Sequence, residues 1–151
     1  MNLSEEIAPG ATGIEQLRAL IASGRGPGIM HSLQFEFISI EPGVAVFEAE
    51  PGLHAYNPIG VIHGGYIATL LDSAAGCAVH SMLPAGARYA SLDLTVKFLR
   101  TLTHDTARVT CEGSVIHMGA RNALAEARLV DGDGRLCAYA SSSYLIIRPG
   151  T

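Results

Sequence analysis

The sequence is poor in cysteine, tryptophan and charge. Its 151 residues include three cysteines and no tryptophan, and 16% of them are charged. The cysteines are odd in number and show no CxxC spacing, so neither a disulfide framework nor a zinc site is predicted. No apolar run reaches the ~18 residues that a membrane span needs. The first residues, MNLSEEIAPG, lack the basic start and apolar core of a signal peptide. We therefore expect a cytoplasmic protein that binds neither a membrane nor a metal.

The few charges are unevenly distributed. The net charge is −4, and residues 88–151 hold eight of the ten lysines and arginines. A nucleic-acid-binding protein normally has a much stronger basic patch, so no nucleic acid is expected as a partner. A small polyanionic ligand needs only two or three well-placed cations, which the second half can supply. A surface with so little charge also favours a homo-oligomer, in which copies of the chain cover one another.

Hydrophobic periodicity and turn residues predict the order of the elements. Helices are expected over 13–23 and about 64–82, and strands over 31–40, 44–50, 88–98, 105–117, 121–131 and 135–147. Because the later strands have short connections, the sheet should be antiparallel. The predicted fold class is α+β: a six-stranded antiparallel sheet wrapped around one long central helix, with a short N-terminal helix. We expect one domain, with a helix and loop in residues 1–29 and the sheet with its helix in 30–151.

The stretch from residue 57 to residue 82 is the most informative part of the sequence. A polar, glycine-rich loop leads into an apolar helix whose one charge is Asp72, and no other charged residue occurs between 51 and 87. A lone carboxylate is costly to bury unless it is hydrogen-bonded or left in a wet cleft. In apolar surroundings its pKa rises and it becomes a better base. The alternative is that Asp72 simply lies on an exposed edge of the helix.

Gly64 and Gly65 stand where this helix begins. The first N–H groups of a helix are unpaired and carry partial positive charge, and glycine lets a ligand oxygen approach them. This arrangement suits stabilisation of an oxyanion in acyl transfer, although the same residues also form ordinary tight turns. Gly64 and Asp72 are eight residues apart, ~12 Å along a helix, so they cannot contact one carbonyl. If they cooperate, they come from two subunits of a two-fold dimer.

These residues resemble a known family. The pattern is Asn57-x-x-Gly60-x-x-His63-Gly64-Gly65-x6-Asp72, followed by Ser91-Leu-Asp93-Leu-Thr-Val-Lys97-Phe-Leu-Arg100. It is similar to the hotdog-fold acyl-CoA thioesterases of the PaaI-like, phenylacetate-degradation type, over about residues 30–147. The resemblance implies a hotdog fold and hydrolysis of an acyl-CoA thioester to a free acid and CoA, with no metal or organic cofactor.

The resemblance also implies roles for particular residues. Asp72 would be the general base or the nucleophile, and the backbone N–H of Gly64 from the partner subunit would polarise the thioester carbonyl. Asn57 would hold the thioester or the water, and Ser91 would orient the water beside Asp72. His63 is included among the candidate catalytic residues, with loop fixation as its expected role. The candidates for binding the CoA phosphates are Arg100, Gly119 and Arg121.

The alternation around Ser91 bears on the oligomer. From Ser91 to Phe98, apolar residues at even positions alternate with polar ones at odd positions. If Ser91 faces Asp72, the apolar residues form a stripe on the outer face of the sheet, and a second dimer would have to cover it. We therefore expect a homodimer with shared sites and a dimer of dimers, that is, a homotetramer.

Two other functions are compatible with the same fold. One is a hotdog hydro-lyase acting on an enoyl or hydroxyacyl thioester, although the sequence offers no obvious second acid–base residue for it. The other is a non-catalytic acyl-CoA binding protein, which would have no need of the carboxylate of Asp72.

Overall fold

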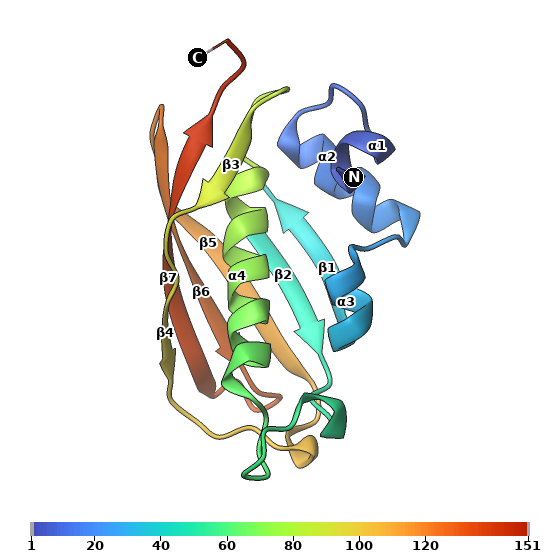
Figure 1. The fold of residues 1–151 in the computed structure, drawn as a ribbon, viewed down its shortest axis with the longest axis vertical. Helices are drawn as coiled ribbons and strands as arrows, with labels where there is room; N and C mark the ends of the chain where they lie inside the picture. The colour runs from blue at the N-terminus through green and yellow to red at the C-terminus, as the bar shows by residue number, and fades with distance from the viewer. Residues whose placement is uncertain (1, 151) are drawn as a thin grey trace.

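A curved antiparallel sheet wraps around one long helix in the computed structural model, which describes residues 2–150 (Figure 1). The strands are β1 (Phe35–Glu41), β2 (Val44–Ala49), β3 (Arg88–Ser91), β4 (Thr95–Phe98), β5 (Val109–Met118), β6 (Asn122–Val130) and β7 (Leu136–Ile147). Their order across the sheet is β1-β2-β5-β6-β7-β3, and β4 also pairs with β7. The short 3-10 helices η1 (Leu53–Ala55) and η2 (His104–Thr106) lie in the connections. The predicted α+β class and antiparallel sheet are confirmed.

The long helix, α4 (Gly64–His80), packs into the concave face of the sheet. Its small residues allow a very close approach to β5. A Cβ atom added to Gly113 of β5 would lie 2.1 Å from the backbone oxygen of Ala74, so only glycine fits at that point. Leu70, Leu71 and Ala74 are at most 1% exposed, and they form the centre of the hydrophobic core.

Three helices precede the sheet, where the sequence predicted one. α2 (Gly13–Ser23) has the predicted bounds: the Glu15 carboxylate accepts from the Thr12 N–H at 2.9 Å, and Gly24 ends the helix at φ +66°. α1 (Leu3–Ile7) and α3 (Gly28–Leu33) were not predicted, because neither is long enough to show a clear apolar period.

The segment before the sheet differs from prediction at its end. The strand expected from residue 31 begins at Phe35, because α3 occupies the first residues of that stretch. The expected boundary between residues 29 and 30 therefore falls inside α3. Leu17 and Leu20 of α2 belong to the same hydrophobic core as α4 and the sheet.

The strand expected over 88–98 is interrupted, so the sheet has seven strands instead of six. The cause is Asp93. Its side-chain oxygen accepts from the Ser143 N–H at 2.8 Å, and its carbonyl accepts from the Ser142 hydroxyl at 2.6 Å. In the stretch between β3 and β4, these bonds to β7 take the place of the regular ladder.

The interruption changes which face the side chains point to. Ser91 of β3 pairs with Tyr144, while Val96 of β4 pairs with Ala140, and both partners are fully buried on the helix side. Ser91 and Val96 therefore both face α4, although an unbroken strand would place them on opposite faces. The predicted outer apolar stripe is wrong: of its members Leu92 is 63% exposed, but Val96 packs against the core.

The helices within residues 2–150 include none with the length and hydrophobicity of a membrane-spanning segment.

Candidate active site

The loop before α4 is held in one conformation by its own polar side chains. The Asn57 Oδ1 atom accepts from the backbone N–H groups of Ile59 at 3.1 Å and Val61 at 3.2 Å. Gly60 has φ +88°, a conformation that strongly favours glycine. His63 is the N-cap residue, and its Nδ1 atom accepts from the Gly65 N–H at 2.8 Å. Asn57 and His63 therefore shape the loop, as expected for His63, and the Asn57 amide nitrogen has no acceptor among the described residues.

This arrangement leaves the Gly64 N–H without an acceptor among residues 2–150. The group is the first N–H of a helix of 17 residues, so it lies at the positive end of the helix dipole. The Phe98 ring lies over this glycine, because a Cβ atom added there would be 3.0 Å from the ring. The helix start thus offers one free backbone donor beside an aromatic ring.

Asp72 lies on the open face of α4, two turns further along the helix. Its side chain is exposed at the rim, and no described residue donates a hydrogen bond to it or pairs with it. Apolar protein on its inner side raises the pKa of this carboxyl above the ordinary value, through desolvation. Both readings of the sequence are therefore partly right, because Asp72 is at an exposed edge and also at the border of a cavity.

The cavity at Asp72 has a volume of about 230 Å³. Its floor is the open face of α4, where Ser73, Gly76 and Cys77 follow Asp72. Ser91 and Tyr89 of β3 line one side of it, so the sheet brings Ser91 to the same cavity as Asp72.

Tyr89 was not predicted as a site residue. A Cβ atom at Gly76 would lie 3.1 Å from the Tyr89 hydroxyl, so the absence of a side chain at Gly76 makes room for Tyr89. Burial raises the pKa of Tyr89, and the negative charge of Asp72 adds to the rise. Burial likewise raises the pKa of Cys77 to about 12. Both groups stay protonated at neutral pH, and Asp72 is the one carboxyl group among the residues that line the cavity. A tyrosine 13 positions after a helical glycine has no local pattern that identifies it.

The predicted site residues fall into two groups within one chain. Asn57, His63 and Gly64 are at the start of α4, and Asp72 and Ser91 are at the cavity. The two groups are separated by eight helical positions, ~12 Å. Within one chain, the Gly64 N–H and the Asp72 carboxylate are therefore too far apart to contact the same carbonyl group.

The candidate CoA-binding residues do not form a cluster. The Arg100 N–H donates to Cys137 at the beginning of β7, whereas the Arg121 carbonyl accepts from Ile146 at its end. Nine strand residues separate these points, about 30 Å. The Gly119 N–H donates to the Asn122 carbonyl at 2.8 Å, so this backbone donor is already engaged within the chain. Arg100 and Arg121 belong to opposite ends of the sheet and cannot bind one phosphate group within a chain.

Across residues 2–150, no three His, Cys, Asp or Glu side chains come together in a group that would hold a metal ion.

Sequence comparison connects this geometry to a family. The sequence pattern of the thioesterase superfamily matches residues 59–138, which include Gly64, Asp72 and Ser91. The chain belongs to the thioesterase superfamily. A provisionally named esterase of Saccharolobus solfataricus is 30% identical to this superfamily member over 120 residues, 80% of this chain and 84% of that protein.

Two other relatives are more distant or match a shorter stretch. A provisionally named esterase of Halobacterium salinarum is 40% identical over 73 residues, which span about half of each protein: 47% of this chain and 46% of the relative. The 1,4-dihydroxy-2-naphthoyl-CoA hydrolase of Listeria monocytogenes is 24% identical over 72% of this chain and 87% of that enzyme.

Solved structures confirm the hotdog fold. AziG of S. sahachiroi has a TM-score of 0.77 and 26% identity, covering 82% of this chain and 98% of that one. The E. coli PaaI protein, from the phenylacetic acid degradation operon, has a TM-score of 0.73 and 23% identity, covering 85% and 89%. The resemblance to PaaI-like thioesterases is confirmed at the level of the fold.

Proposed function

We propose that this superfamily member hydrolyses an acyl-CoA thioester to a free carboxylic acid and CoA. The observation that carries the proposal is the Asp72 carboxylate, which has no partner among the described residues and borders a cavity with no other charged residue. An unpaired carboxylate with a raised pKa is costly to the fold and suited to proton abstraction. The name of the Listeria relative supports CoA as the leaving group.

Two routes use the same atoms. As a general base, Asp72 takes a proton from a water molecule whose oxygen attacks the thioester carbon. As a nucleophile, Asp72 attacks that carbon itself and forms a mixed anhydride, which water then hydrolyses. In both routes the carbon–sulfur bond breaks and CoA leaves as the thiolate, which takes up a proton. Ser91, at the same cavity, orients the water, and neither route requires a metal or a redox step.

The carbonyl oxygen needs a donor while negative charge develops on it. The Gly64 N–H at the start of α4 has no acceptor among residues 2–150, and a donor of this kind stabilises an oxyanion. Because Gly64 and Asp72 of one chain are ~12 Å apart, the donor comes from the partner subunit. A two-fold dimer then has two equivalent sites. Pairing of dimers into a tetramer stays a prediction, without the outer apolar stripe as its argument.

A thiol-release assay on aryl and fatty acyl-CoAs tests the activity. We expect the wild-type chain to release CoA and Asp72→Asn to lose that release while remaining folded. Release that survives in Asp72→Asn would reject the role of Asp72. If no acyl-CoA releases CoA but CoA raises the melting temperature, hydrolysis is rejected in favour of a non-catalytic acyl-CoA binding function.

Mixing two inactive variants tests the shared site. Asp72→Asn and Gly64→Pro each damage one half of the site. Random reassociation of equal amounts makes half of the dimers mixed, each with one intact site, so about a quarter of wild-type activity should return. If both groups acted within one chain, mixing would restore nothing.

A further inference from the structure

The cavity at Asp72 has a wall that lies outside the stretch matched by the family pattern. Leu20 of α2, Pro27 before α3, and Ile29 and Met30 of α3 line it. All four precede residue 59, where the match to the superfamily begins. Figure 1 shows α3 beside β1, at the side of α4 away from β3. The N-terminal helices therefore supply part of the site that the common features of the superfamily do not determine.

The same wall continues into an aromatic cluster from the sheet. Phe35 and Phe37 of β1 and Phe47 of β2 line the cavity. The rings of Phe37 and Phe47 are stacked with centroids 4.3 Å apart, and Phe35 packs at 5.9 Å from Phe47. Asp72 is the one charged residue lining the cavity. The phenylalanine rings favour an apolar group in this cavity, and a negatively charged one is disfavoured, because a second carboxylate would meet the charge of Asp72 without a cation to offset it.

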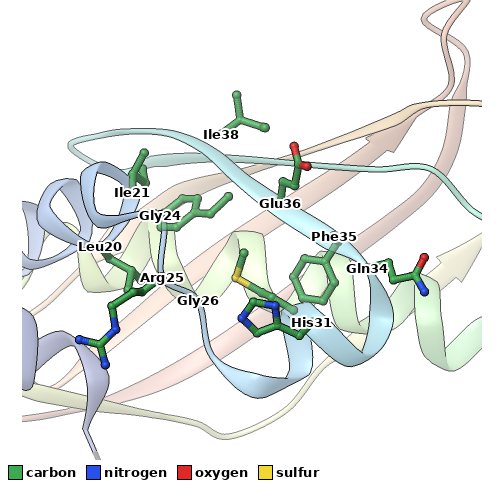
Figure 2. A pocket seen from close by; sticks show the side chains of 12 residues that line it. Leu20, Ile21, Gly24, Arg25, Gly26, His31, Gln34, Phe35, Glu36 and Ile38 are labelled. Atoms are coloured by element: carbon green, nitrogen blue, oxygen red, sulfur yellow. The ribbon is translucent and has the colours of Figure 1, made fainter.

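A second cavity, of about 550 Å³, borders the first one. It lies between the α2–α3 segment and β1, and Figure 2 shows Leu20, His31 and Phe35 among the side chains around it. Leu20, Met30, Phe35 and Phe37 line both cavities, so these side chains form the partition. Met30 is the unbranched, flexible member of the partition, and methionine adapts readily to the shape of a ligand.

We propose that the α2–α3 segment is the acyl-specificity wall of the site. This inference rests on the proposed function. An uncharged apolar acyl group, aryl or aliphatic, lies between Met30 and the phenylalanines, with its carbonyl carbon at Asp72. Met30 sets the size limit for the acyl group. Displacing its side chain opens the way to the second cavity, and a larger side chain at this position fills the first.

Substitutions at Met30 test the size limit by kcat/KM on acetyl-, octanoyl-, palmitoyl-, phenylacetyl- and succinyl-CoA. Met30→Trp should lower kcat/KM for octanoyl- and phenylacetyl-CoA by about 10- to 100-fold and change acetyl-CoA by less than about twofold, as expected when a pocket loses the room for a few methylenes. Met30→Ala should raise the kcat/KM for palmitoyl-CoA relative to that for octanoyl-CoA. Succinyl-CoA should be the poorest substrate of its size. Met82→Trp, at a 42% exposed methionine outside both cavities, is the matched control.

A binding measurement separates this inference from the proposed function. The chain has no tryptophan, so Ile29→Trp places a single fluorophore at the wall, at a residue that is 49% exposed. The non-hydrolysable thioethers S-octyl-CoA and S-benzyl-CoA should shift its emission. They should not shift the emission of a tryptophan placed by Leu53→Trp, because Leu53 is 71% exposed and lies outside both cavities.

The outcomes distinguish the two claims. A response of Ile29→Trp in a chain that hydrolyses no thioester supports the wall and rejects hydrolysis. Hydrolysis with no response at Ile29→Trp, or with equal effects of Met30→Trp on short and long acyl groups, overturns the wall and leaves hydrolysis standing. The octyl and benzyl probes separately show whether an aliphatic or an aryl group fits.

Discussion

The two faces of α4 obey different constraints. On the inner face, Leu71 and Ala74 are fully buried, and Ala74 touches the backbone of β5 at Gly113. On the outer face, one position away from Leu71, Asp72 has no partner among residues 2–150 and borders a cavity. On the inner face, close packing against the sheet limits the size of each side chain.

The outer face contributes little to the stability of the single chain. A desolvated carboxylate without a partner raises the free energy of the folded state, and the Gly64 N–H donates to no acceptor within the described chain. Substitutions on the inner face should therefore change stability, and those on the outer face should change activity. Each prediction below tests that separation.

The largest effect is expected for Asp72→Asn. The amide is almost isosteric but cannot accept a proton, and general base catalysis contributes about 10²- to 10⁴-fold. We expect kcat for acyl-CoA hydrolysis to fall by about 10³-fold, with the melting temperature unchanged or higher. A fall in melting temperature of several degrees would show that Asp72 stabilises the fold, and would contradict the assignment of activity alone to the outer face.

Gly64→Pro should have the next largest effect. Proline removes the one N–H of interest at the first position of the helix, where its fixed φ is well tolerated, and His63 before it already has ψ 135°, as proline requires. Loss of an oxyanion donor costs about 10²- to 10³-fold in kcat.

Gly64→Ala is the control for that substitution, because it keeps the N–H and adds only a methyl group against Phe98. Equal losses in Gly64→Pro and Gly64→Ala would assign the effect to crowding at Phe98 and reject the backbone donor.

Gly113→Ala tests the inner face. The new methyl group would overlap the Ala74 carbonyl, and overpacking of a core costs about 1 to 3 kcal/mol. Urea denaturation should show this loss in the free energy of unfolding. Gly132→Ala is the matched control, since its nearest atom is at 3.9 Å, and it should be almost neutral. If both glycines behave alike, the contact between α4 and β5 is looser than described.

The smallest effect is the pH dependence. Asp72 must be ionised to act, so kcat/KM should rise with pH through a pKa above the ordinary 3.8. Stability has the opposite sign: because the folded pKa lies above the unfolded one, the folded state binds more protons between them, and the Asp72 contribution to stability falls as pH rises through that window. The difference in unfolding free energy between wild type and Asp72→Asn, followed by urea titration from pH 3.5 to 7, should show that slope. A flat difference would mean that Asp72 is as solvated in the folded chain as in the unfolded one.

Features with a local pattern were predictable. The bounds of α2, the start of α4 and the glycine-rich loop before it follow from apolar period and glycine content. Asp72 was identifiable because no other charge lies near it in the sequence. The short helices α1 and α3 were missed, because five or six residues carry too little periodicity.

The sequence by itself determined the fold class, the order of the long elements and the position of the lone carboxylate, because these depend on neighbours a few residues apart. The tertiary structure alone decided which residues meet Asp72. Asp93 interrupts the strand between Ser91 and Val96 and reverses the alternation, so both face α4. Met30 reaches the cavity from 42 residues before Asp72, and no local spacing records such a contact. Side-chain period is a property of an unbroken strand, whereas a cavity is formed by elements that meet only when the chain has folded.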